Sequence, residues 1–353
     1  MIDFKSLVYQ AIEEKATDIH LTVGIMPMFR INGTLTPASE KCLEDEDTLA
    51  VARELVPEEQ LEELEKAGEV DFAVTYDNSI RMRCNVFHQQ GHTAIAIRLL
   101  PIDIPTIEML GIPDILVAQA DKKHGLILAT GPTGSGKSSA LAALIDHINQ
   151  TSSRHIITLE NPIEYVHKHQ KCLINQREIG QDTTSFAAGL RAALRQDPDV
   201  ILVGEMRDLE TISTAITAAE TGHLVFGTLH TKSAPETIDR IIDVFPAEQQ
   251  EQIRIQLSEV LECVVSQTLV PSIDNDRVAA REILLAVPAV RNQIRQNQSF
   301  QLKSTMQTAK RQGMMLMDDA LFELYRKRKI TLENALSFAN DPAALQAQCM
   351  RGV

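Results

Sequence analysis

Residues 131–138 read Gly-Pro-Thr-Gly-Ser-Gly-Lys-Ser and match the pattern G-x-x-x-x-G-K-[ST] at every fixed position. A loop of this kind wraps phosphate groups with its own backbone N–H groups. It therefore needs residues that tolerate positive φ and close approach, here Gly134 and Gly136. Lys137 supplies a point charge to the β- and γ-phosphates, and the Ser138 hydroxyl is suited to bind Mg²⁺. This motif constrains the chain around it to a strand, a loop and a helix.

The sequence on either side of the loop supports a nucleotide site. The apolar run 126–128 precedes the loop, and an amphipathic helix is expected over 137–149. The positive dipole end of that helix would face the phosphates. We therefore expect the chain to bind ATP and Mg²⁺. The expected nucleotide-binding residues are Gly131, Pro132, Thr133, Gly134, Ser135, Gly136, Lys137, Ser138 and Ser139.

The overall charge of the chain argues against nucleic acid as a partner. Its 353 residues include 34 Lys and Arg against 48 Asp and Glu, a formal net charge of −14. A surface of that sign repels phosphate backbones. Aromatic residues make up 4% of the chain and Trp is absent, which disfavours a stacking platform for single strands. We expect no nucleic-acid partner.

Cysteine spacing and the absence of long apolar runs indicate the cellular compartment in which the chain is expected to work. The five cysteines are far apart and form no C-x-x-C pair, which excludes a zinc ribbon or a thioredoxin-type motif. The first residues lack the basic stretch and apolar run of a signal peptide. No segment approaches the ~18 uninterrupted apolar residues of a membrane span. The expectation is a cytoplasmic protein with reduced thiols, which would serve a membrane machine from the cytoplasmic side.

Residues 1–100 are predicted to form a small mixed α+β domain. Strands are expected over 80–87 and 93–99, where apolar residues alternate with polar ones. A hairpin turn is expected at Asn32-Gly33, because this dipeptide favours tight turns between strands.

The rest of the chain is predicted to be a linker and a larger α/β domain. Three prolines fall within residues 101–114, and proline fixes φ and removes a hydrogen-bond donor, so this segment is read as a linker. Over 115–353 strands alternate with longer helices, which indicates a mostly parallel sheet covered by helices. The expected strands lie near 126–129, 156–159, 200–203 and 224–229, with helices over 137–149, 183–196, 247–268 and much of 290–340.

Hydrolysis of ATP requires a carboxylate that orients water. Residues 197–205 contain an apolar strand whose C-terminal end carries Glu205. In a parallel sheet the C-terminal ends of the strands face the ligand. Many P-loop proteins have Asp at the strand end, whereas this chain has Gly204 there. Glu205 is therefore the carboxylate best placed for the attacking water, and a solvated loop glutamate is the alternative.

Three further side chains follow predicted strands at the same edge. Glu160 and Glu164 come after the strand at 156–159. They are candidates to hold Mg²⁺-bound water together with Ser138, or else they are ordinary loop charges. His230 follows the strand at 224–229, where it is suited to sense the γ-phosphate, with a structural histidine as the alternative.

Four segments in this order resemble the Walker A, Asp, Walker B and His boxes of the type II/IV secretion ATPases. They are residues 131–138, 160–167, 204–208 and 221–231. The resemblance extends over nearly the whole chain, and segments 17–21, 173–178 and 244–248 also resemble the family. It is closest to the PilT-type ATPases that retract type IV pili. The fold it implies is a PAS-like N-terminal domain joined to a RecA-like ATPase domain.

The resemblance also implies roles for the candidate residues. Glu205 would be the catalytic glutamate, Glu160 and Glu164 the Asp-box carboxylates, and His230 the phosphate-contacting histidine. Such proteins form homohexameric rings that hydrolyse ATP, with nucleotide in the cleft between domains, and power twitching motility. The chain would act at the base of the pilus, peripheral to the inner membrane. Its expected partners are the inner-membrane pilus platform protein and other pilus ATPases.

Three arginines of the N-terminal domain match family residues that close over the nucleotide. Arg81 and Arg83 are two apart on an expected strand, so both project from one face of it. Arg98 lies on the next expected strand. Without the resemblance, surface ion pairing with nearby carboxylates is the alternative reading of these residues.

The chain departs from the family pattern at two places. The Asp box usually reads Glu-Asp-Pro, but Asn161 replaces the aspartate, so that position is not a metal candidate. The retraction motif usually reads Ala-Ile-Arg-Asn-Leu-Ile-Arg-Glu. Residues 289–296 here read Ala-Val-Arg-Asn-Gln-Ile-Arg-Gln, and Arg291, Asn292 and Arg295 remain.

Other functions on a similar fold remain as alternatives. Assembly ATPases for pilus extension or secretion usually carry a tetracysteine zinc insertion and a longer N-terminal region, and neither is present. An accessory retraction ATPase of the PilU kind is disfavoured by the motif at 289–296. A conjugative or DNA-transfer motor conflicts with the net charge of −14. A nucleotide-gated scaffold that does not hydrolyse ATP conflicts with the intact Lys137, Ser138 and Glu205.

Overall fold

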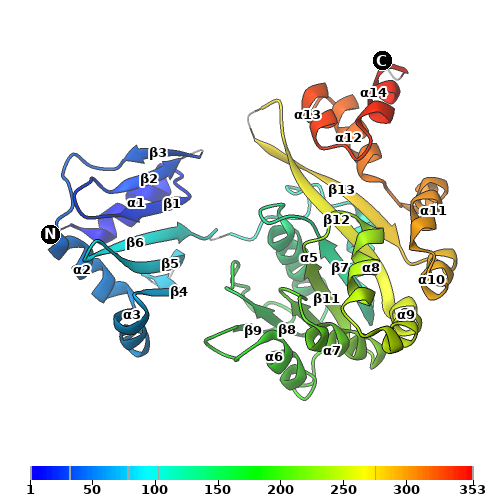
Figure 1. Cartoon of the computed structure of the whole chain (residues 1–353), viewed down its shortest axis with the longest axis horizontal. Helices are drawn as coiled ribbons and strands as arrows, with labels where there is room; N and C mark the ends of the chain where they lie inside the picture. Colours follow the sequence, from blue (N-terminus) through cyan, green and yellow to red (C-terminus); the bar gives the residue numbers. More distant parts are fainter. Residues whose placement is uncertain (1, 32, 78–79, 102, 275, 352–353) are drawn as a thin grey trace. The chain divides into compact units, whose positions relative to one another are not determined.

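The computed structural model describes residues 2–31, 33–77, 80–101, 103–274 and 276–351. The chain folds into two compact units, both drawn in Figure 1. The first comprises Met1–Asp103 with Pro162–Val166, and the second comprises Ile104–Asn161 with His167–Val353. Across the described residues, no helix combines the length and the apolar character that crossing a membrane requires.

The N-terminal unit is built on a six-stranded antiparallel sheet of strand order β3-β2-β1-β6-β5-β4 (Figure 1). The strands are β1 Asp18–Leu21, β2 Met28–Ile31, β3 Thr34–Pro37, β4 Glu69–Tyr76, β5 Ile80–Gln89 and β6 His92–Leu99. Helices α1 (Phe4–Glu13) and α2 (Asp45–Leu55) bury their apolar faces in the same core as the strands. The unit is thus the mixed α+β domain that the sequence predicts.

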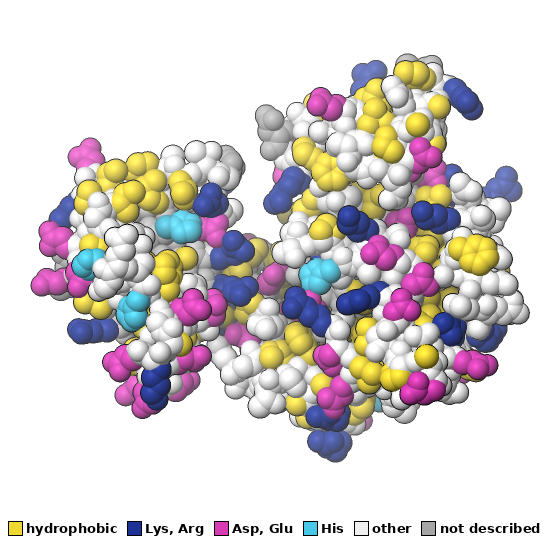
Figure 2. Space-filling view, in the orientation of Figure 1, with side chains coloured by type: hydrophobic (Ala, Val, Ile, Leu, Met, Phe, Trp, Pro, Cys, Tyr) yellow, Lys and Arg dark blue, Asp and Glu magenta, His cyan; other side chains and the backbone are white. Residues whose placement is uncertain are grey.

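Helix α3 (Leu61–Ala67) of this unit is solvated on most of its surface. A short helical turn over Glu58–Gln60 precedes it. Only Leu64 of α3 is buried, and the glutamates around it are exposed. Figure 2 shows acidic side chains gathered over this end of the unit. Such a face is typical of a helix that contacts water rather than a ligand.

The predicted strand faces of the N-terminal unit are confirmed. Along β5, Met82 and Cys84 are fully buried, whereas Arg83 is exposed and Arg81 partly exposed. Side chains alternate between the two faces of a strand, so the two arginines share the outer face. Strands β2 and β3 pair as the expected hairpin, although Asn32 of the predicted turn lies outside the described residues.

The second unit contains a seven-stranded sheet of order β13-β12-β7-β11-β10-β8-β9. Neighbouring strands from β12 to β9 are parallel, and β13 pairs antiparallel with β12. The strands are β7 Gly125–Thr130, β8 His155–Glu160, β9 Leu173–Glu178, β10 Val200–Val203, β11 Leu224–Leu229, β12 Leu261–Pro271 and β13 Arg277–Leu285. Each residue of β10 and β11 is buried, as expected for strands covered on both faces.

Helices cover this sheet and complete the predicted RecA-like α/β fold (Figure 1). They are α4 Asp114–Ala120, α5 Lys137–Thr151, α6 Phe186–Ala193, α7 Leu209–Glu220, α8 Ala234–Asp243 and α9 Ala247–Val260. Five further helices follow β13 and form the C-terminal part, namely α10 Pro288–Arg295, α11 Leu302–Thr308, α12 Met317–Arg326, α13 Leu332–Ser337 and α14 Pro342–Arg351. The strands expected near 126–129, 156–159, 200–203 and 224–229 are present as β7, β8, β10 and β11.

The helix predicted over 247–268 is wrong in its second half. Helix α9 ends at Val260, and the chain continues as β12 from Leu261. The apolar residues Leu257, Leu261 and Val264 have helical spacing, which explains the prediction. However, β12 pairs with β7 on one side and β13 on the other. Pairing with the distant β7 and with β13, the next strand along the chain, outweighs the local apolar spacing.

A buried carboxylate joins the C-terminal helices to the sheet. Glu282 on β13 is 1% exposed. Its Oε1 accepts a hydrogen bond from Ala234 N at 2.8 Å and its Oε2 accepts one from Met317 N at 3.4 Å. These N–H groups begin α8 and α12, where a negative charge is favoured. Burial raises the pKa of Glu282 above its ordinary value, while the two backbone bonds act in the opposite direction.

Arg291 of the retraction-like motif at 289–296 stabilises the end of α9. Its Nη1 donates to the carbonyl oxygens of Ser258 at 2.8 Å and Glu259 at 2.7 Å, and its Nη2 donates to Glu262 Oε1 at 2.9 Å. The last carbonyl groups of a helix have no partner within the helix, and a cation there is stabilising. Arg291 therefore has a structural role at the end of α9.

We expect Arg291→Ala to lower the free energy of unfolding of the protein by about 2 kcal/mol, because hydrogen bonds to a charged group contribute about 1.5–3 kcal/mol. Arg295→Ala is the matched control on the same helix, since Arg295 is exposed, and it should cost less than about 0.5 kcal/mol. Urea unfolding followed by circular dichroism measures both. Equal losses for the two variants would contradict the capping role of Arg291.

Candidate nucleotide-binding site

Three glycines shape the loop between β7 and α5. Gly131, Gly134 and Gly136 have φ values of 138°, 76° and 82°, which L side chains rarely adopt. A Cβ at Gly131 would lie 2.2 Å from the Gln267 carbonyl oxygen, and one at Gly136 would lie 2.9 Å from Gln267 Nε2. A Cβ at Gly134 would meet nothing within 4 Å, so only its φ requires glycine. The loop is thus packed directly against β12.

Lys137 begins α5, and its side chain folds back over the loop. The ammonium donates to Gly131 O at 2.7 Å and to Pro132 O at 3.0 Å. The N-cap of α5 is Gly136, which has no side chain to cap the first N–H groups of the helix. These N–H groups can therefore bind a phosphate. Among the nine predicted residues, the exposed ones are Pro132, Thr133, Gly134 and Ser138, the partly exposed ones Gly136, Lys137 and Ser139, and the buried ones Gly131 and Ser135.

Glu205 and His230 lie in contact. They follow β10 and β11, which are parallel neighbours with Val203 opposite Gly227. His230 Nε2 lies 2.7 Å from Glu205 Oε1, and Arg207 Nε donates to the same oxygen. The Glu205 side chain is 20% exposed. The parallel pairing of the two strands therefore produces a carboxylate–imidazole pair at the edge of the sheet.

The position before this carboxylate excludes a larger residue. A Cβ at Gly204 would lie 2.9 Å from the carbonyl oxygen of Leu159. The Gly204 N–H donates to that same oxygen at 2.8 Å, and the Thr228 hydroxyl donates to the Gly204 carbonyl. The strand end is therefore too tightly packed for the aspartate that many P-loop proteins have there, which leaves Glu205 as the next available carboxylate.

Glu160 lies at the end of β8 and has neutral hydrogen-bond partners. Its Oε1 accepts from Thr158 Oγ1 at 2.6 Å and from Gln176 Nε2 at 3.1 Å. Gln176 comes from the neighbouring strand β9 and was not singled out from the sequence. Two donors on one oxygen hold the carboxylate in a defined orientation. Glu164 falls in Pro162–Val166, the short segment that groups with the N-terminal unit.

The oxygen donors present are of the type that Mg²⁺ takes. Within the described part of the chain, no cluster of three or more His, Cys, Asp or Glu side chains could hold a metal ion. Mg²⁺ at nucleotide sites is usually bound by one or two protein oxygens, with phosphate oxygens and water completing the shell. The exposed hydroxyl of Ser138 at the start of α5 and the carboxylate of Glu160 fit that pattern.

The three arginines named from the sequence lie in the N-terminal unit on adjacent strands. Arg83 of β5 stands opposite Arg98 of β6. Arg98 Nε donates to Asp18 Oδ1 at 2.9 Å, and Arg81 Nη1 donates to Thr75 Oγ1 at 3.4 Å. Asp18 is 9% exposed and was not predicted as a partner of these arginines. Arg83 and Arg98 therefore occupy neighbouring positions on adjacent strands of the sheet.

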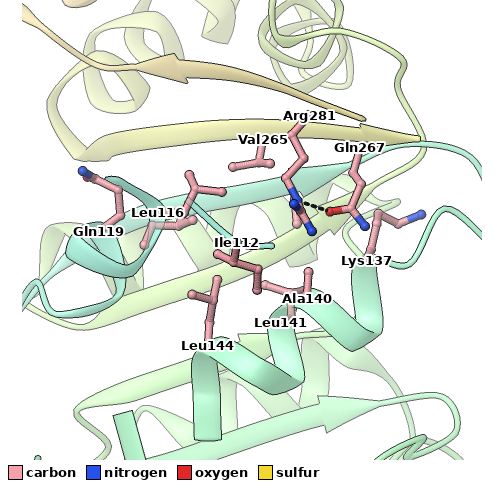
Figure 3. Close-up of a pocket in the computed structure, with 12 residues that line it drawn as sticks. Ile112, Leu116, Gln119, Lys137, Ala140, Leu141, Leu144, Val265, Gln267 and Arg281 are labelled. Carbon is pink, nitrogen blue, oxygen red and sulfur yellow. Dashed lines mark hydrogen bonds between the residues drawn. The ribbon is translucent and has the colours of Figure 1, made fainter. Parts of the chain in front are cut away.

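Two buried polar residues behind the phosphate loop were missed from the sequence. Gln267 on β12 is 5% exposed and Arg281 on β13 is 8% exposed. Figure 3 shows their side chains pointing toward one another, and Arg281 Nε donates to Gln267 Oε1 at 2.7 Å. Burial lowers the pKa of Arg281 to about 10, so its guanidinium remains charged at neutral pH. No sequence signal pointed to either residue, because 247–268 was predicted as a helix and no strand was predicted over the residues that form β13.

Comparisons with known proteins agree with this fold and site. The family model described as "Type II/IV secretion system protein" matches residues 1–343. The type IV pilus retractation ATPase PilT of Pseudomonas aeruginosa is 46% identical over 341 residues, covering 97% of this chain and 99% of the relative. The type IV pilus ATPase PilU of the same organism is 38% identical over 352 residues, covering 99% and 92%.

A solved structure shows the same similarity in three dimensions. The crystal structure of the pilus retraction motor PilT with bound ADP has a TM-score of 0.93 to this chain at 49% sequence identity. The match covers 98% of this chain and 100% of the other. By its matching family model and its near full-length relatives, this chain belongs to the type II/IV secretion system protein family.

Proposed function

We propose that this chain is an ATP-hydrolysing motor that powers the retraction of a type IV pilus and thereby twitching motility. Two observations support the proposal: the near full-length similarity to a retraction ATPase, and the glycine-shaped phosphate loop together with the Glu205–His230 pair. The first points to the biological process and the second to the chemistry.

Nucleotide binding rests on the loop at 131–139. The phosphates of ATP would displace the loop carbonyls as partners of Lys137, whose ammonium already points into the loop. Backbone N–H groups at the start of α5 would supply the remaining hydrogen bonds. Bound Mg²⁺ would neutralise charge on the β- and γ-phosphate oxygens. Ser138, Glu160 and Glu164 are the residues proposed to hold it or its water.

Glu205 is proposed to position the attacking water and accept its proton. Both contacts to its side chain fall on Oε1, so Oε2 can accept a hydrogen bond from water. His230 and Arg207 hold the carboxylate through Oε1, and His230 is proposed to contact the charge that develops on the phosphate. Rate enhancement from such positioning comes from orientation and electrostatics rather than from covalent chemistry.

Arg81, Arg83 and Arg98 are proposed to contact the triphosphate during hydrolysis. Guanidinium groups suit this role because their planar fork binds phosphate oxygens in pairs. All three lie on the adjacent strands β5 and β6, where Arg83 stands opposite Arg98. Contact between these arginines and the nucleotide would connect each hydrolysis event to movement of the N-terminal unit.

The ring and its partners are also proposed. We infer a homohexamer that works at the cytoplasmic face of the inner membrane, where it would dock on the pilus platform protein and cooperate with other pilus ATPases. A PilU-type accessory ATPase is the second candidate, since that relative covers 99% of the chain. The higher identity to the retraction ATPase, 46% against 38%, favours the first.

Binding and hydrolysis should separate in two variants. Glu205→Gln should keep ATP affinity within a few fold, because Glu205 is not one of the residues of the phosphate loop. Its turnover should fall by about 10²-fold or more, the scale lost with a positioned proton-transfer group. Lys137→Ala should instead lose nucleotide binding. Equilibrium binding of a fluorescent nucleotide and phosphate release measure the two quantities. Near-normal turnover of Glu205→Gln would reject its role and direct attention to Glu160.

Arg83→Ala should reduce turnover strongly while the ring still assembles, and Arg83→Lys should restore little of it because the planar fork is lost. Arg53→Ala is the matched control, since Arg53 is an exposed arginine on α2 of the same unit. Phosphate release and size-exclusion chromatography with light scattering measure activity and assembly. If Arg83→Ala and Arg53→Ala hydrolyse ATP equally fast, the arginines serve only surface ion pairing.

A further inference from the structure

Gln267 of β12 lies against both ends of the phosphate loop, through its side chain at Ser135 and its backbone at Gly131. Its Nε2 donates to Ser135 O at 2.7 Å. Its backbone oxygen fills the space beside Gly131, where a Cβ would lie 2.2 Å away. Its Oε1 accepts from Arg281. An amide group can present its oxygen or its nitrogen in either direction, and here the choice is determined, because a guanidinium offers only donors.

Orientation of the Gln267 amide fixes a peptide plane in the loop. The peptide bond between Ser135 and Gly136 is planar, and in the trans form its C=O and N–H point in opposite directions. The Ser135 carbonyl is held toward Gln267 on β12. The Gly136 N–H is therefore directed away from Gln267. Release of the Ser135 carbonyl would let this plane rotate.

Arg281 is bound on its other side to the turn at the start of the ATPase unit. Its Nη1 donates to Gly111 O at 2.8 Å and its Nη2 to Leu110 O at 2.9 Å. All three of its partners are neutral groups. Removing a charge from water is costly, and only a full set of hydrogen bonds compensates for it. Displacement of residues 110–111 would therefore also disturb the bond between Arg281 and Gln267.

We propose that Arg281 and Gln267 are positioning residues that orient the Gly136 N–H for phosphate binding and couple this orientation to the turn at Leu110–Gly111. The proposal rests on the proposed ATPase function, because it assigns the pair to the same phosphate loop. The turn lies seven residues into the unit that starts at Ile104, within the predicted linker 101–114. A linker movement that shifts this turn would lower nucleotide affinity, and bound nucleotide would stabilise the turn by the same free energy.

The first test uses Gln267→Met, which keeps the size of the side chain but has no N–H to offer to Ser135. The dissociation constant for ADP of the full-length chain should rise about tenfold, the effect of losing one hydrogen bond of about 1.4 kcal/mol. The kcat at saturating ATP should change less than the dissociation constant, because Glu205 is untouched. Arg281→Lys should also weaken ADP binding, since one ammonium cannot span three acceptors.

A matched control separates positioning from general stability. Arg154 donates to the carbonyl oxygens of Lys122 at 2.8 Å and Asp121 at 3.0 Å, so it bridges two backbone oxygens as Arg281 does. It makes no contact with the phosphate loop. Arg154→Met should bind ADP within about twofold of the unaltered chain, a difference within the usual range for a site without shared partners.

Hydrogen exchange measured by mass spectrometry tests the coupling. Saturating ADP should slow exchange in peptides that cover 104–112 of the unaltered chain and of Arg154→Met. That slowing should be lost in Gln267→Met and Arg281→Lys at ADP concentrations that saturate them. Unchanged ADP affinity in Gln267→Met, or slowing that persists in both variants, would overturn the proposal. So would failure of both variants to fold, because the pair would then be a requirement of the fold. An unaltered chain that does not bind ADP would instead refute the proposed function.

Discussion

The close fit between the phosphate loop and β12 is the constraint on which the nucleotide site depends. Gly131 and Gly136 leave no space for a Cβ because Gln267 occupies it, and the hydroxyls of Thr130 and Ser266 lie 2.8 Å apart at the base of the loop. Loop and strand are separated by more than a hundred residues, so the loop takes its shape only when the sheet is complete. Positive φ at three glycines and a neighbouring strand thus combine to present backbone N–H groups to a phosphate.

The parallel sheet explains why the other candidate residues gather at one edge. β8, β10 and β11 run in the same direction in register. The residues that end or follow these strands, Glu160, Glu205 and His230, therefore lie at the same edge of the sheet. This arrangement was predictable, because apolar strands followed by polar residues are visible in the sequence. The alternation of Arg81 and Arg83 with buried residues on β5 was predictable for the same reason. The specific roles of these side chains in hydrolysis stay predictions.

The features that could not be predicted depend on contacts between distant segments. Nothing near Val260 signals the change from helix to strand, because the pairing of β12 with β7 and β13 decides it. Gln267 lay within the helix predicted over 247–268 and Arg281 outside every predicted element, whereas the antiparallel register of β12 and β13 places them opposite one another. Arg291 was interpreted as part of the retraction motif at 289–296. Its contacts with the end of α9 were not visible in the local sequence. Local patterns report which face of a strand or helix is buried, but they do not report which distant residue lies against it.

The account joins an ATP-driven site to a single cellular event, the shortening of a pilus. The most direct measurement follows the length of fluorescently labelled pili in living cells of the organism that encodes this chain, after deletion of its gene. The account predicts that pili still extend but no longer shorten, and that surface motility returns when the gene is restored. Pili that continue to retract at the normal rate would contradict the account. Cells that assemble no pili would also contradict it, because the chain would then drive extension rather than retraction.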